Sequence, residues 1–109
     1  MILEISMWNI EAMTGYQPKT TFWMDFSIAD KFGKGAVLDT YQRAFDNWKD
    51  DPVYLTELVM VLNWKLWEHH DAGNTVLAET YDKLWSEADE YAMDNLTGED
   101  LSYFLSTTD

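Results

Sequence analysis

The sequence predicts a mostly all-α fold, a compact bundle of four to five helices. Apolar residues recur at spacings of three and four over several stretches, which is the period of an amphipathic helix. Short segments containing Gly, Pro, Asn and Asp separate those stretches, and short connections join neighbouring helices in bundles. With 109 residues, 47% of them hydrophobic and 16% aromatic, the chain suits a single helical domain over residues 1–109.

The N-terminal part of the chain predicts a first segment, a loop and then a helix. Residues 1–14 show no clean period, so they fit either a strand or a short helix. A loop containing Gly and Pro follows. The next helix is expected to begin after an N-cap at Thr20 or Thr21 and to end at Gly33 or Gly35. Its apolar face comprises Phe22, Phe26, Ala29 and Phe32.

Residues 36–49 carry the clearest amphipathic pattern. Their apolar residues project within about 100° of one another, and they are Val37, Leu38, Tyr41, Ala44, Phe45 and Trp48. Asp51 suits the N-cap of a further helix, and Pro52 suits its first position. That helix, residues 52–71, is the most apolar and has two stripes on opposite sides. The stripes are Leu55, Leu58, Val59, Leu62 and Leu66, and Met60, Trp64 and Trp67.

Residues 76–95 predict another helix, because the segment Ala72-Gly73-Asn74-Thr75 supplies a stop and a new cap before it. Its expected buried stripe is Leu77, Tyr81, Leu84, Ala88, Tyr91 and Ala92. Thr97 and the acid three residues later then resemble a capping box, which predicts a short last helix. The apolar residues of that helix are Leu101, Phe104 and Leu105.

The charge balance excludes several classes of function. Twenty acidic and seven basic residues give a net charge of −13, and residues 69–109 hold ten of the acids with one base. This charge disfavours direct binding to nucleic acid or to an anionic membrane. The absence of cysteine excludes disulfides and thiolate zinc sites, and no apolar run could span a bilayer. A basic secretion signal is also missing, so a cytoplasmic location is expected.

The strongest candidate site is the polar face of the helix at residues 76–95. Its acids project within about 80° of Glu79 on either side, and Lys83 is the only cation among them. The other acids of this face are Asp82, Glu87, Asp89, Glu90 and Asp94, and Glu99 and Asp100 could extend the row. Carboxylates on successive turns can imitate phosphates, so a groove that attracts nucleic acid would attract this face. The alternative is a solvated face that serves solubility.

Two further groups of residues are weaker candidates. Met60, Trp64 and Trp67 would mark a partner or dimer surface if exposed, whereas packing into the core is the alternative. The adjacent pair His69 and His70 points about 100° apart, so no metal site is predicted, and His69 is expected to be a satisfied helix-end histidine. Neither a phosphate-binding glycine loop nor a nucleophile elbow is present, so we predict no catalytic residue and no cofactor.

Three segments carry a resemblance to known proteins: Thr21-Phe22-Trp23, Asp39-Thr40-Tyr41 and Tyr54-Leu55-Thr56-Glu57-Leu58. With them, the chain resembles the small acidic accessory proteins of bacterial prophages and conjugative elements. Anti-restriction and anti-CRISPR inhibitors occur among those proteins, and they often present acids to a nucleic-acid-binding site. The resemblance therefore implies an inhibitor, and it transfers no individual functional residue.

The leading expectation is an inhibitor, not an enzyme, that mimics nucleic acid and occupies the basic channel of a host nuclease or effector complex. The runner-up is a non-catalytic interaction module or homodimer that uses Met60, Trp64 and Trp67 while the acids keep it soluble. A third hypothesis, a small-molecule enzyme, requires a concave polar site that sequence alone cannot reveal.

Overall fold

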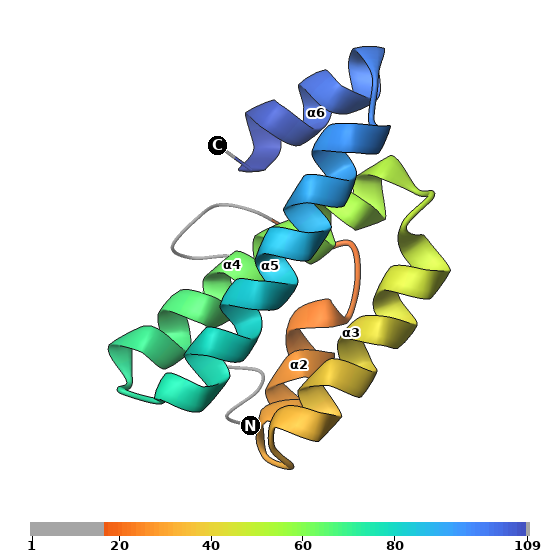
Figure 1. Ribbon diagram of the computed structural model, residues 1–109. Coiled ribbons are helices and arrows are strands. Elements are labelled where there is room, and N and C mark those ends of the chain that lie inside the picture. The colour runs from red at the N-terminus through yellow and green to blue at the C-terminus, as the bar shows by residue number, and fades with distance from the viewer. Residues whose placement is uncertain (1–16, 109) are drawn as a thin grey trace.

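The computed structural model describes residues 17–108, and these residues form five helices and no strand (Figure 1). The helices are α2 (Phe22–Asp30), α3 (Lys34–Trp48), α4 (Pro52–Asp71), α5 (Thr75–Asn95) and α6 (Gly98–Thr108). The predicted all-α class is confirmed. The prediction of a strand or a short helix for residues 1–14 lies outside the described residues.

Helices α4 and α5 run side by side and make the most extensive helix–helix contact of the fold. Helices α2 and α3 form a hairpin that packs on this pair, with α2 against α4 and α3 against both long helices. Helix α6 turns back at the end of α5 and also rests on α4 (Figure 1). No helix within residues 17–108 combines the length and the apolar character needed to cross a membrane.

The predicted capping residues set the boundaries of the two long helices. The side chain of Asp51 accepts hydrogen bonds from the backbone N–H groups of Val53 and Tyr54, both at 3.1 Å, and Pro52 occupies the first turn. Asn74 caps α5 by accepting from the N–H of Leu77 at 3.4 Å. These bonds satisfy donors that a helix N-terminus otherwise leaves free.

Glycine adopts a positive φ in two of the turns between helices. Gly33 has φ of 100° between α2 and α3, and Gly73 has φ of 77° between α4 and α5. Side chains with a Cβ disfavour this region, so glycine lets the chain reverse there at little cost. The sequence predicted an end at Gly33 or Gly35, whereas α2 ends at Asp30 and Gly33 is the N-cap residue of α3.

A buried carboxylate ties the segment before α2 to α4. Glu57 is 1% exposed, and its two oxygens accept from the backbone N–H of Lys19 at 2.7 Å and of Thr20 at 2.8 Å. The Thr20 hydroxyl also donates to Glu57 and accepts from the N–H of Phe22 at 3.2 Å. Thr20 therefore supplies the capping bond, although the N-cap position itself belongs to Thr21.

The core lies where α2, α4 and α5 meet. Phe26 and Tyr81 are fully buried and pack edge to face with ring centroids 5.6 Å apart, and Phe104 closes the core from α6. The predicted stripes of α4 and α5 supply most of the other core residues, which include Leu55, Leu58, Val59, Leu62, Leu77, Leu84, Ala88 and Ala92.

Four of the apolar residues that the sequence pattern assigned to these helices are exposed. Phe32 is 77% exposed because α2 ends at Asp30, so the turn carries its ring away from the helix face. Leu38 lies at the border of the α3 stripe and stays exposed. Trp48 is the last residue of α3 and is 37% exposed, with its ring against that of Tyr54. Leu105 is exposed at the outer side of α6.

Candidate functional site

The acids predicted on α5 lie on the side of that helix opposite the core. Buried residues of α5 occupy one side of the helix, and five of the acids are exposed on the other. The exposed acids are Glu79, Asp82, Glu87, Glu90 and Asp94. Glu99 and Asp100, in the first turn of α6, are exposed as well. We call these seven residues the acidic face.

The carboxylates of the acidic face have no basic partner among the residues that the structure describes. Within residues 17–108 the ion pairs are Lys65 with Asp30 and Glu68, His69 with Asp30, and His70 with Asp71. None of them includes a residue of the acidic face. Lys83 is exposed among these acids and pairs with none of them. The negative charge of α5 is therefore available to an external cation.

Tyr41 connects the acidic face to α3. Its hydroxyl donates to Glu87 Oε1 at 2.9 Å, so this hydrogen bond bridges the two helices. Burial raises the pKa of Tyr41, and the carboxylates of Glu87 and Asp46 raise it further. Asp46 on α3 thus lies close enough to act on the same hydroxyl, and it extends the negative potential beyond α5. Sequence periodicity along α5 could not reveal Asp46, because only the packing of α3 brings it there.

Asp89 differs from the other predicted acids of α5. It is only half-exposed, at the border between the acidic face and the packed side of the helix. Burial raises the pKa of its carboxyl above the usual range for aspartate, because a partly desolvated carboxylate loses hydration. Asp89 is thus a weaker contributor of exposed charge than its helical position predicts.

The stripe Met60, Trp64 and Trp67 does not form one exposed surface. Met60 is 8% exposed and Trp64 is half-buried, whereas Trp67 is 53% exposed with its ring 5.2 Å from that of His70. Because Met60 is buried, an interface built on all three side chains would require Met60 to leave its buried position. Trp67 alone is accessible to a partner.

A buried polar network joins α2, α4 and α5. Lys65 is 1% exposed, and its ammonium contacts Asp30 at 2.6 Å, Glu68 at 2.5 Å and Ser27 at 3.2 Å, so three oxygens surround it. The ring of Trp23 covers the same ammonium, with its centroid at 4.5 Å. The cation of Lys65 is therefore balanced inside the protein instead of at the surface.

Asp30 is the centre of this network. Its carboxylate contacts Lys65, lies 2.8 Å from His69 Nε2 and accepts from the hydroxyl of Tyr81 at 2.5 Å. Burial and the hydrogen bond to Asp30 raise the pKa of Tyr81 well above its usual value. The predicted satisfied histidine at the end of α4 is confirmed. The sequence analysis missed this network. Its signal was the isolated Lys65 within the most apolar helix, because a buried charge requires a partner.

Asp30, Glu68 and His69 also bring three potential metal-ligand atoms within 4.8 Å of one another. The ammonium of Lys65 contacts two of these three side chains, so a metal ion would have to displace it. The arrangement is that of an internal ion-pair network, in which the lysine supplies the positive charge.

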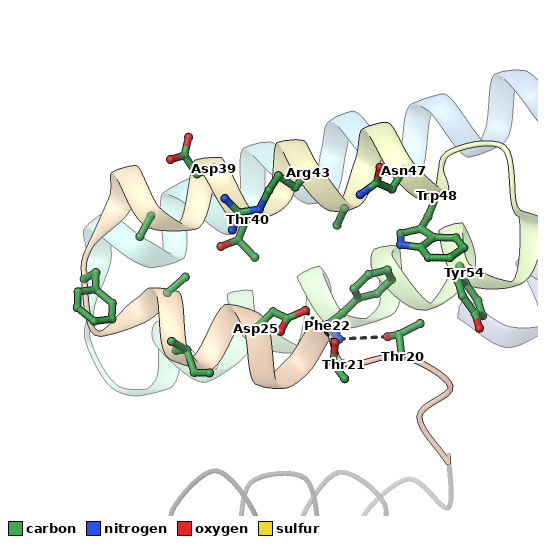
Figure 2. Close-up of a pocket in the computed structure, with 15 residues that line it drawn as sticks. Thr20, Thr21, Phe22, Asp25, Asp39, Thr40, Arg43, Asn47, Trp48 and Tyr54 are labelled. Atoms are coloured by element: carbon green, nitrogen blue, oxygen red, sulfur yellow. Dashed lines mark hydrogen bonds between the residues drawn. The ribbon is translucent and has the colours of Figure 1, made fainter.

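A groove of about 700 Å³ separates α2 from α3 (Figure 2). Its floor is formed by Phe22, Ala29 and Ala44, which are buried. Trp48 and Tyr54 stand together at one end, with ring centroids 4.5 Å apart. Sequence patterning did not predict the groove, because it depends on how far α2 and α3 separate along their common length.

Comparisons of the chain with protein-family models, with curated proteins and with solved structures found no match.

Proposed function

We propose that this protein is a non-catalytic inhibitor whose acidic face occupies the basic nucleic-acid channel of a host nuclease or effector complex. The observation that carries the proposal is a row of exposed carboxylates along α5 for which residues 17–108 provide no basic partner. Unpaired charges of one sign attract a surface of the opposite sign at long range.

The charge density of the row supports mimicry of a nucleic-acid strand. Five exposed acids lie between Glu79 and Asp94, a stretch of about 22 Å at about 1.5 Å per residue. One strand of B-DNA carries a phosphate about every 3.4 Å along the axis, which is six or seven phosphates over about the same length. The row therefore approaches the linear charge of a single strand.

The support of α5 makes the row rigid. Its opposite side is buried from Leu77 to Ala92, and the bond between Tyr41 and Glu87 fixes its orientation against α3. A rigid arrangement of charges loses little conformational entropy when it binds. The exposed side chains can then contact a channel without refolding of the backbone.

The experiment tests whether binding depends on these charges. The protein is immobilised and exposed to lysate of a bacterial host at about 0.1 M salt, and bound proteins are eluted at about 1 M salt, where the Debye length falls from about 10 to about 3 Å. The eluted proteins are then tested for binding to labelled nucleic acid. We expect the eluate to contain a nucleic-acid-binding protein. We also expect the soluble chain to displace this protein from its nucleic acid.

The variant Glu79→Lys/Glu90→Lys should lose both capture and displacement. Its matched control is Asp50→Lys/Asp71→Lys, which changes the net charge equally at exposed positions outside the acidic face. Circular dichroism verifies that both variants are folded. Equal capture by the two variants, or capture only of proteins that bind no nucleic acid, would contradict the proposal.

A further inference from the structure

The hairpin of α2 and α3 carries much of the exposed apolar surface of the described chain. Eight large apolar side chains are exposed, and four of them lie on this hairpin: Ile28, Phe32, Leu38 and Trp48. Three of the four line the groove between the helices. Clustered exposed apolar residues are typical of interaction surfaces, whereas scattered ones are not.

The charge of the hairpin differs from that of the acidic face. Residues 22–48 hold four acids and three bases, whereas residues 75–108 hold eight acids and one base. The repulsion that keeps two highly negative molecules apart is therefore weaker at the hairpin than at α5 and α6. Exposed charges more than a Debye length away, about 8 Å at physiological salt, are largely screened. A second copy can approach at this face.

Two of the three charged residues that line the groove are complementary to each other, and the ion pairs within residues 17–108 include neither. Asp39 and Arg43 both line the groove and are exposed. They stand four residues apart on α3, a spacing that allows an ion pair within a helix, yet none of the ion pairs of residues 17–108 includes either of them. Figure 2 shows Asp39 directed outward, while Arg43 extends toward Thr40.

We propose that the groove between α2 and α3 is a homodimer interface, in which α3 of a second copy lies antiparallel to α3. In a two-fold arrangement, if residue i of one copy contacts residue j of the other, then residue j of the first copy contacts residue i of the second. If the axis crosses α3 at the level of residue 41, midway between Asp39 and Arg43, then Asp39 of each copy faces Arg43 of the partner subunit.

The test is the mass of the purified protein in solution. Sedimentation velocity over a concentration series should show the 12.8 kDa monomer converting to a species of twice that mass. Arg43→Glu places two acids opposite each other at both ends of the axis and should weaken dimerisation by about tenfold or more. Asp39→Arg should do the same through opposed cations.

The double variant Asp39→Arg/Arg43→Glu should recover the dimer, because it restores both pairs with reversed polarity. Lys83→Glu is the matched control, since it makes the same charge change as Arg43→Glu at an exposed position on α5, and it should keep the wild-type mass. A wild-type protein that stays monomeric throughout, or a folded double variant that dimerises no better than the single ones, would overturn the proposal. These measurements require no host protein and are independent of the proposed inhibition.

Discussion

At the scale of single residues, Lys65 shows how the chain accommodates a charge inside its core. Three oxygens within 3.2 Å and the face of Trp23 surround the ammonium. Desolvating a cation is costly, and such a network offsets the cost only when its geometry is complete. The buried position therefore depends on Asp30 and Glu68 as much as on the lysine itself.

Replacing Lys65 by Met should destabilise the protein by about 3–5 kcal/mol, because Asp30 is then left buried without its closest cation. Adding Asp30→Asn to the variant should recover part of this loss, since the uncompensated charge is removed. Urea unfolding followed by circular dichroism measures both effects. Lys83→Met is the control at an exposed position, where a change within about 0.5 kcal/mol is expected. Equal losses for the two lysine variants would contradict the role of the network.

At the scale of helices, local signals predicted the boundaries and failed at the borders of apolar faces. Asp51 caps α4 as predicted, and Asn74, one of the four residues of the predicted stop and cap, caps α5, because capping depends on residues within one turn. Phe32 and Leu38 lie on the apolar faces that the spacing predicts, yet they are exposed. Their burial would depend on where α2 ends and how α3 rotates against its neighbours, and neither is fixed by spacing along one helix.

Asp51→Ala should destabilise the protein by about 1 kcal/mol, because the N–H groups of Val53 and Tyr54 lose their acceptor. Asp50→Ala is a matched control: it removes the same charge one residue earlier, from an exposed position in the turn. Thermal unfolding of both variants gives the comparison. The capping role fails if Asp50→Ala lowers the melting temperature as much as Asp51→Ala does.

At the scale of the whole molecule, the features predictable from sequence are those that lie on one helix. Spacing alone placed the acids of α5 opposite its buried stripe, because a single helix fixes their relative directions. Asp46, the network around Asp30 and the groove beside α3 each require two or more helices to meet. No rule of local periodicity states which helices become neighbours, so these features emerge only from the packed structure.

Two hydrogen-bonded tyrosines link α5 to the hairpin. They should make the free energy of unfolding of the whole protein decrease as the pH rises into the alkaline range. Tyr81 donates to Asp30 on α2, and Tyr41 on α3 donates to Glu87. Burial, with these carboxylates, raises the pKa of both phenols above the ordinary value of 10.0. Above pH 10 the folded protein thus retains two phenol protons that the unfolded chain releases.

Because the folded pKa values are raised, the stabilisation from these phenols is complete below pH 10 and is lost as pH rises above it. Each tyrosine should lower the free energy of unfolding by up to about 1.4 kcal/mol for every pH unit in that range. Urea unfolding at several pH values between about 8 and about 12 measures the slope. Tyr41→Phe and Tyr81→Phe should each reduce the slope by one proton, and the double variant by two. If the double variant keeps the wild-type slope, groups other than these two phenols control alkaline unfolding.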